Sequence, residues 1–172
     1  MKFRKASFEA YRDACSLIYK EIDEKEMKDW WEHIELPRRS SDGSAGYDFV
    51  IPFDIEIKAN VPIIIPTGIA FDSERKDVCL MILPRSSTGI KYGLRFLNTV
   101  PLIDVDNVQG FSENQIFLCT ITSKDCILHK GDKFAQAVIL PYLITEDDDV
   151  CIKNDMSLFS QQGFKPWGFA NL

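Results

Sequence analysis

Short apolar segments separated by turn-forming residues dominate the chain from residue 40 onward, and this pattern restricts the fold more than any other feature. The segments are rich in isoleucine, valine and phenylalanine, and most end at glycine, proline, asparagine or aspartate. No helical period runs through them, which is typical of strands in an all-β barrel or sandwich. The clearest examples are YDFVIPFDIEI, VPIIIPTGIAF, VCLMILP, QIFLCTIT and FAQAVILPYLI. We therefore expect a mainly β fold.

The N-terminal region has a different pattern, which predicts helices. Apolar residues recur there at steps of three and four, which places them on one face of a helix. They are Phe8, Tyr11, Cys15, Ile18 and Ile22. Ser7 is the expected N-cap of this helix. A second helix is expected from about Asp23 to His33, with Pro37 ending it.

The length of 172 residues suits one compact β domain with additions at both ends. We expect a helical extension over residues 1–37, a β domain over 38–145 and a C-terminal tail over 146–172. The tail ends in QQGFKPWGFANL, which reads as an irregular segment able to dock onto another surface.

Composition excludes several classes of function. The net charge is −6, which does not fit a nucleic-acid-binding protein. No apolar run approaches the roughly 20 residues that span a bilayer, so no membrane helix is expected. The five cysteines form no CxxC pair and the N-terminus lacks the pattern of a secretory signal, so we expect a cytoplasmic protein. His33 and His129 have no ligand-spaced neighbours, which argues against a histidine metal site.

Residues 84–93, PRSSTGIKYG, are the best candidate for an anion site. Arg85 can fork onto a phosphate, and the hydroxyl groups of Ser86 and Ser87 can donate to it. Gly89 lets the chain curl, so we expect a turn that binds an anion. The alternative is an ordinary turn with a solvated arginine.

Two segments place carboxylates between strands. Asp48 lies in SAGYDF, where Gly46 permits close approach of the backbone. Asp104 and Asp106 alternate in a strand-like stretch and so face the same side. Asp104 follows two apolar residues and is a candidate general base. The alternatives are a capped turn at Asp48 and an aspartate-rich hairpin at Asp104.

A fourth segment, KGDKFAQAVILP, covers residues 130–141. It predicts a turn followed by a strand that buries Val138 and Leu140. Gln136 is a polar residue in this apolar context. By itself the segment requires no chemistry.

Taken in order, the four segments resemble the motifs of the trimeric dUTPase (dUTP diphosphatase) family. The matching stretches are AGYDF at 45–49, PRSSTGIKYG at 84–93, NTVPLIDVDN at 98–107 and GDKFAQAVI at 131–139. Each match is short, but four in this order and spacing are specific, and the resemblance covers residues 38–143.

The resemblance implies a distorted antiparallel β jelly roll, the dUTPase-like β-clip, that assembles as a homotrimer. Active sites would lie between subunits, and the tail of one subunit would close over a neighbouring site. The implied reaction is attack of water on the α-phosphorus of dUTP, which releases dUMP and pyrophosphate. A Mg²⁺ ion would bridge the phosphates.

The resemblance also implies a role for individual residues. Asp104 corresponds to the residue that orients and activates the water, and Asp48 to a carboxylate that contacts the metal through water. The corresponding substrate-binding residues are Arg85, Ser86, Ser87, Asn98, Leu102, Ile103, Gln136 and Phe164. The partner is therefore dUTP or a related nucleotide.

Two positions and the tail differ from the usual family pattern. Asn107 stands where a tyrosine usually packs under the deoxyribose, and Pro101 stands where glycine is usual. The tail contains no arginine, and Lys165 is the cation nearest to Gly163-Phe164. A working pyrophosphatase and a homologue that binds nucleotide without turnover, or with altered specificity, both remain open.

Two other classes of function are less consistent with the sequence. A dCTP deaminase places a catalytic glutamate in the strand after the third motif, but QIFLCTIT contains Cys119 near that place and no acid. A purely structural or interaction role would use Trp30 and Trp31 as a partner surface, yet aromatic residues at helical spacing more often belong to the core.

Overall fold

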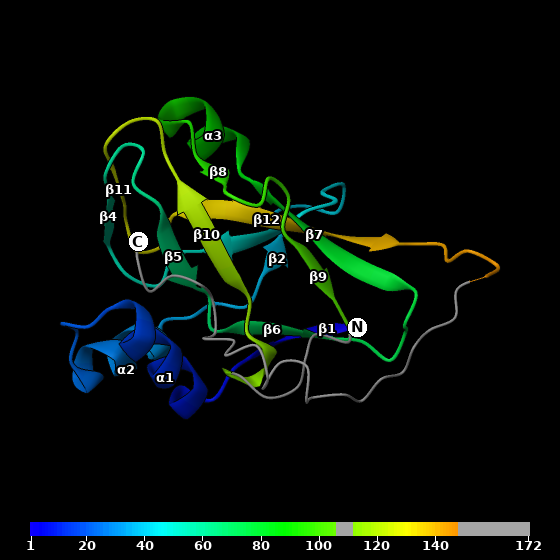
Figure 1. Cartoon of the computed structure of the whole chain (residues 1–172), viewed down its shortest axis with the longest axis horizontal. Helices are drawn as coiled ribbons and strands as arrows, with labels where there is room; N and C mark the ends of the chain where they lie inside the picture. The colour runs from blue at the N-terminus through cyan, green and yellow to red at the C-terminus, as the bar shows by residue number, and fades with distance from the viewer. Residues whose placement is uncertain (106–111, 148–172) are drawn as a thin grey trace. The chain divides into compact units, whose positions relative to one another are not determined.

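The computed structural model describes residues 1–105 and 112–147 (Figure 1). Residues Met1–Tyr142 form one compact unit. The fold is mainly β and all strand pairs are antiparallel, which confirms the sequence prediction. In the described ranges the sheets stay open and form no closed barrel.

The helices are α1 (Phe8–Ile18), α2 (Glu24–Glu32) and α3 (Ser86–Tyr92), with a 3₁₀ turn η1 (Ser112–Asn114). The strands are β1 (Lys2–Lys5), β2 (Arg38–Arg39), β3 (Tyr47–Val50), β4 (Ile55–Ile57), β5 (Ile63–Pro66), β6 (Ile69–Asp72), β7 (Val78–Pro84), β8 (Arg95–Phe96), β9 (Leu102–Asp104), β10 (Phe117–Ile121), β11 (Cys126–Leu128) and β12 (Lys133–Pro141). Each of the five apolar segments contains at least one of these strands. Strands β1, β2, β8 and β11 lie outside these segments and were not expected from the sequence.

The largest sheet has the strand order β2-β3-β12-β7-β9, and Figure 1 shows β12, β7 and β9 side by side. Because side chains alternate along a strand and antiparallel partners share a face, the register assigns each residue to one face. The buried residues of the core face are Phe49, Leu80, Ile82, Ala135 and Ala137. The opposite, outward face carries polar and half-exposed side chains.

The expectation that Val138 and Leu140 are buried is wrong, because both are only half-buried on the outward face. The cause is a register shift in β12 between Lys133 and Ala135. Strict alternation from buried Phe134 would put residues 138 and 140 inside. The bulge inserts one residue and reverses the phase of the strand, so Ala135 and Ala137 face the core instead.

The N-terminal region contains the two expected helices and one unexpected strand, but α1 ends at Ile18 and does not include Ile22 as expected. Ser7 caps α1, since its Oγ accepts a hydrogen bond from the Ala10 N–H at 3.2 Å. Strand β1 precedes the helix and pairs with β6, so the extension is not entirely helical. Helix α2 ends at Glu32, before Pro37, where the N–H groups of His33 and Ile34 donate to the carbonyls of Trp30 and Trp31 at 3.1 and 3.2 Å in the tighter i→i−3 pattern.

Aromatic stacking and a glycine attach the helices to the β core. The ring of Trp30 stacks on Phe53 with centroids 3.9 Å apart. Gly68 has φ +64°, and a Cβ there would lie 2.3 Å from Ile34 Cδ1. Tyr11 lies against the same glycine and is fully buried. Only glycine therefore fits under this part of the extension.

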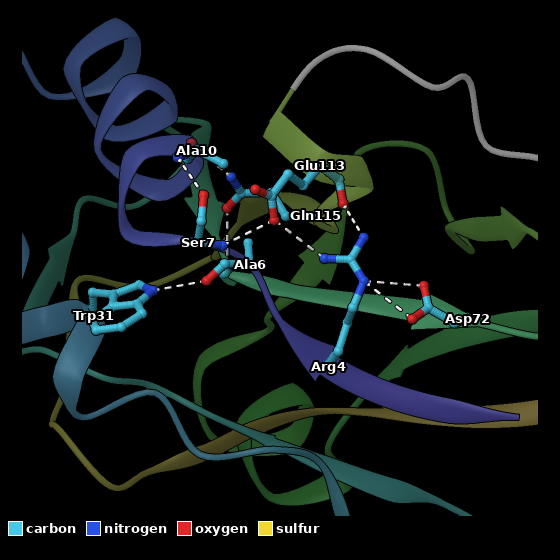
Figure 2. Close-up of polar contacts among 9 residues, drawn as sticks. Arg4, Ala6, Ser7, Ala10, Trp31, Asp72, Glu113 and Gln115 are labelled. Carbon is cyan, nitrogen blue, oxygen red and sulfur yellow. Dashed lines mark hydrogen bonds and ion pairs between the residues drawn. The ribbon is translucent and has the colours of Figure 1, made fainter.

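Polar contacts centred on Glu113 join the N-terminus to η1 (Figure 2). The Nε of Arg4 donates to both carboxylate oxygens of Asp72 at 3.1 Å, and its Nη2 donates to the carbonyl of Glu113 at 2.8 Å. The Glu113 carboxylate accepts the N–H of Ser7 at 3.0 Å and an ion pair from Arg4 at 3.3 Å. Glu113 has φ 53°, so these contacts hold a backbone conformation that non-glycine residues rarely adopt.

Two further side chains bridge the same junction (Figure 2). The Nε2 of Gln115 donates to the Ala10 carbonyl at 3.1 Å, and its Oε1 accepts the N–H of Gly68 at 3.2 Å. The indole of Trp31 donates to the Ala6 carbonyl at 2.9 Å. The start of α1 is therefore hydrogen-bonded to β-core loops.

In the described part of the chain, no helix is long and apolar enough to cross a membrane.

We predict that Arg4→Met lowers the free energy of unfolding by about 1–2 kcal/mol, because it removes several charge-assisted hydrogen bonds at a half-buried site. The midpoint of thermal unfolding should fall by about 5 °C. Arg12→Met is the matched control, since Arg12 pairs only with its exposed neighbour Asp13 among the described residues. Equal midpoints for the two variants would contradict the prediction.

Candidate functional site

A buried carboxylate in β3 is the centre of a polar cluster on the outward face. Asp48 is only 3% exposed, and its oxygens accept from three side chains. Ser40 Oγ donates at 2.6 Å and Lys133 Nζ at 2.9 Å to Oδ2, while Arg85 Nη1 lies 2.5 Å from Oδ1. Burial by itself raises the pKa of Asp48, but the hydrogen bonds from Ser40 and Lys133 and the charge of Arg85 outweigh it and hold the pKa below its usual value. Asp48 is therefore a charged residue that the fold neutralises.

The bulge in β12 brings two side chains to this cluster. Lys133 pairs with Val50, and Gln136 pairs with Asp48. Three positions apart in a regular strand, Lys133 and Gln136 would point to opposite faces. Because the bulge adds one residue between them, both share the face of Asp48. From the sequence, segment 130–141 predicts only a turn followed by a strand, and the pairing register is what reveals the contact of Lys133 with Asp48.

Gly46 allows the Gln136 side chain to lie against the backbone. A Cβ at position 46 would come within 2.6 Å of Gln136 Oε1 and 3.3 Å of its Cβ and Cδ. The sequence prediction of a close approach at this glycine is thereby confirmed. The amide group of Gln136 is thus positioned by β12 on one side and by Gly46 on the other.

Residues 84–93 were expected to form an anion-binding turn, but most of the segment forms the short helix α3. Arg85 precedes it as N-cap with no side-chain cap, and its N–H donates to the carbonyl of Phe134 at 2.9 Å. Thr88 Oγ1 donates to the carbonyls of Arg85 and Phe134 at 2.9 and 3.1 Å. These bonds tie the start of α3 to the bulged end of β12. The hydroxyl groups of Ser86 and Ser87 lie exposed in the first turn.

Helix α3 ends at Tyr92, and Gly93 is the C-cap residue whose conformation closes the segment. Gly93 has φ +64°, and a Cβ there would lie 2.0 Å from Ser123 Oγ. The sequence had singled out Gly89 as the residue that lets the chain curl. Gly89 instead lies inside the helix, and its N–H bonds to the carbonyl of Arg85 at 2.9 Å.

The second candidate carboxylate, Asp104, lies at the end of edge strand β9. It pairs with Cys79 of β7 and its side chain is exposed. Leu102 is exposed and Ile103 is half-buried. Pro101 is buried, and its carbonyl accepts the N–H of Ile82 at 2.9 Å. Proline therefore preserves the acceptor that links this segment to β7, although it has no N–H to donate.

Asn98 lies in the connection between β8 and β9. It is exposed, and it precedes Thr99, which has φ 64°. Its carbonyl accepts the N–H of Val100 at 2.7 Å. The side chain of Asn98 is thus presented from a tight turn.

The structure brings Asp48, Arg85 and Gln136 together but leaves Asp104 apart from them. Asp48 aligns with Leu83 of β7 through Gln136, whereas Asp104 aligns with Cys79. Three strand spacings and four residues separate the two aspartates, which corresponds to about 20 Å. Both lie on the outward face, because Cys79 and Leu83 are an even number of residues apart.

The predictions for Phe164, Asp106 and Asn107 fall outside the described residues. Lys133 and Ser40 are the site residues that sequence reasoning missed. Lys133 was visible as a cation in a matched motif, but no spacing rule connects Ser40 to Asp48, since their contact depends on the pairing of β2 with β3.

The described residues offer oxygen ligands for a cation one at a time rather than as a cage. They contain no group of three or more histidine, cysteine, aspartate or glutamate residues that could hold a metal. Mg²⁺ in nucleotide enzymes is commonly held by one or two carboxylates together with substrate phosphates and water. The site therefore fits an ion that arrives with a phosphate ligand and contacts protein carboxylates sparingly.

The chain is similar to known proteins of one family over most of its length. A family model described as dUTPase matches residues 32–164. A deoxyuridine 5'-triphosphate nucleotidohydrolase from Psychrobacter arcticus is 36% identical over 133 residues, which cover 76% of this chain and 84% of the relative. The crystal structure of dUTPase from Streptococcus mutans has a TM-score of 0.61 and 27% identity, and the match covers 85% of this chain and 99% of that chain.

A more distant structure shares the fold alone. It is a mutant dUTPase from phage phi11 of S. aureus, with a TM-score of 0.58 and 17% identity over 67% of this chain and 88% of that chain. That study describes the coordination of a structural Mg(II) ion in the phage protein.

We predict that Asp48 makes stability depend on pH. Because its folded pKa lies below the unfolded value of about 3.9, its contribution is present above that value and is lost as the pH falls through the folded pKa. Asp48→Asn should lower the free energy of unfolding by about 2–3 kcal/mol at pH 7. The difference from wild type should shrink between pH 5 and pH 3, measured by denaturant unfolding.

Asp13→Asn controls for the loss of an exposed carboxylate and should leave stability at pH 7 unchanged. A difference between wild type and Asp48→Asn that stays constant down to pH 3 would show that folding does not lower the pKa of Asp48.

Proposed function

The chain belongs to the dUTPase family, and we propose that it hydrolyses dUTP to dUMP and pyrophosphate. The observation that carries this proposal is the outward face of the five-stranded sheet. That face presents a cation-and-amide cluster around Asp48 and, separately, the exposed carboxylate of Asp104. Phosphoryl transfer depends on positioning and charge neutralisation, which such a face supplies.

Arg85 is the proposed phosphate ligand, assisted by Ser86 and Ser87. Its guanidinium is held by Asp48 while its side chain remains partly exposed. An arginine already oriented by a buried carboxylate loses little freedom when a phosphate binds. The exposed hydroxyl groups at the start of α3 lie next to it in sequence and donate to the same ligand. Gln136, positioned against Gly46, is a further polar contact to the nucleotide.

Asp104 is the proposed general base. It orients a water molecule and accepts its proton as the water oxygen forms a bond to the α-phosphorus. The bond from that phosphorus to the bridging oxygen breaks, and pyrophosphate leaves. The backbone of Leu102 and Ile103 and the side chain of Asn98 are proposed to contact the base and sugar. Phe164 of the tail is proposed to stack on the nucleotide.

The separation of the two carboxylates supports a site shared between subunits. A carboxylate about 20 Å from the Arg85 cluster cannot act on a phosphate bound there in the same chain. We propose a homotrimer in which Asp104 of one subunit completes the cluster of the next. Half-exposed apolar side chains on the outward face would pack in that interface. They are Met81, Leu83 and Val138, beside exposed Leu102.

Mg²⁺ is proposed to enter as the complex with the triphosphate. When bound, it neutralises phosphate charge and favours departure of pyrophosphate. The chain's own contribution is Arg85 at the phosphates, and Asp48 lies beside that arginine rather than open to the ion. Because its oxygens are bonded to Ser40, Lys133 and Arg85, Asp48 is proposed to contact the ion only through water, as the resemblance implies.

We propose that the chain has three parts. They are an N-terminal extension (residues 1–37), a β domain (38–145) and a C-terminal tail (146–172), and the tail closes over a neighbouring site. The four described cysteines are free, which fits a cytoplasmic protein. Strand β10 contains Cys119 but no acid, which does not favour a deaminase.

Pyrophosphate release from a panel of nucleoside triphosphates with Mg²⁺ tests the activity. We predict turnover of dUTP and its loss, by at least about a hundredfold, in Asp104→Asn, because the water would lack its base. Turnover of another nucleotide would place altered specificity at Pro101 and Asn107. Nucleotide binding without any turnover would overturn the proposed hydrolase.

The shared site is tested by mixing two inactive variants. Asp104→Asn and Arg85→Ala subunits, coexpressed in equal amounts, should regain about a quarter of wild-type activity, because a quarter of random interfaces combine two intact halves. Each variant alone is the control. Failure to recover activity in mixed oligomers would contradict the shared site without contradicting dUTP hydrolysis.

Removal of the metal should separate catalysis from folding. Because Mg²⁺ is proposed to bind with the triphosphate, EDTA should abolish turnover and excess Mg²⁺ should restore it. The midpoint of thermal unfolding without nucleotide should be the same in EDTA and in Mg²⁺. A lower midpoint in EDTA would show that an ion stabilises the protein itself.

A further inference from the structure

Strand β2 presents a second arginine to the polar cluster around Asp48. Arg38 pairs with Asp48 in the antiparallel register of β2 and β3, so the two side chains share the outward face. Gln136 lies in the same row on the next strand. Directly opposed residues have Cβ atoms about 5 Å apart, which places Arg38 beside the pair formed by Asp48 and Arg85.

Arg38 has no partner within the described residues, although it is exposed beside a carboxylate. Asp48 is already occupied by Ser40, Lys133 and Arg85. The adjacent Arg39 is different, because its Nη1 donates to the carbonyls of Asp42 and Ser44 at 2.8 and 3.3 Å. Arg39 therefore holds the loop before β3, while the guanidinium of Arg38 is left for a ligand.

The charges around Asp48 do not balance. Arg85 and Lys133 pair with Asp48, and Arg38 lies opposite it in the register, so three cations stand beside one carboxylate and leave two positive charges in a chain of net charge −6. Asp132, the neighbour of Lys133 in the sequence, forms no ion pair with these cations among the described residues, and its carboxylate accepts the N–H of His129 at 2.9 Å. An excess of this size favours a ligand with several negative charges, and arginine forks suit phosphate oxygens.

The sequence gives a reason for an additional guanidinium here. No arginine follows Arg95, so the tail has only Lys153 and Lys165 as cations. We propose that Arg38 is a further phosphate-binding residue of this site, which contacts the terminal phosphates of the bound nucleoside triphosphate. This inference rests on the proposed function for the identity of the nucleotide, but its charge argument concerns phosphate alone.

The test compares Arg38→Gln with wild type, using inorganic tripolyphosphate as the binding probe and dUTP as the substrate. Tripolyphosphate affinity should fall about tenfold, and the KM for dUTP should rise by a similar factor with kcat little changed. Inhibition by dUMP, which lacks the terminal phosphates, should change less than twofold. Arg38→Lys should recover part of the affinity, because it keeps the charge but not the fork.

Arg12→Gln removes the same charge from α1 and should leave both affinities unchanged. Thermal unfolding of each variant separates lost contacts from lost folding. Unchanged tripolyphosphate affinity in Arg38→Gln, equal weakening of dUMP and dUTP, or no tripolyphosphate binding by wild type would each overturn the inference. Wild type that binds tripolyphosphate through Arg38 but does not hydrolyse dUTP would overturn only the proposed function.

Discussion

One extra residue in β12 determines which side chains meet on the outward face. The bulge between Lys133 and Ala135 reverses the alternation of the strand, so that Lys133 and Gln136 both join Asp48. It also turns Ala135 and Ala137 toward the core and leaves Val138 and Leu140 half-buried outside. A regular strand would keep either the lysine or the glutamine in the cluster, but not both.

The buried carboxylate of Asp48 imposes the next constraint. An ionised group that is nearly excluded from water must be paired, and here the donors come from three separate segments of the chain. Pairing fixes the edge formed by β2 and β3 and orients Arg85 before any ligand arrives. That preorganisation is what an electrostatic phosphate site requires, since the charges need not be rearranged during the reaction.

Much of this could be predicted from the sequence. Alternating apolar segments predicted the mainly β fold, and the helices with the Ser7 cap followed from periodicity and capping chemistry. Gly46 was identified as a point of close approach because only glycine lacks a Cβ. Errors occurred where tertiary pairing overrides local pattern. A segment read as a turn became α3, β1 pairs with β6 far along the chain, and Val138 and Leu140 point outward.

The sequence alone determined the type of fold and most of the polar residues at the site, because strand periodicity and motif order are local properties. Only the tertiary structure decided how those residues combine. Ser40, Lys133 and Arg85 reach Asp48 because strands distant in sequence pair in one register, and Asp104 lies about 20 Å away because β9 pairs at the other end of β7. Register is a long-range property, since a shift of one residue exchanges the two faces of a strand.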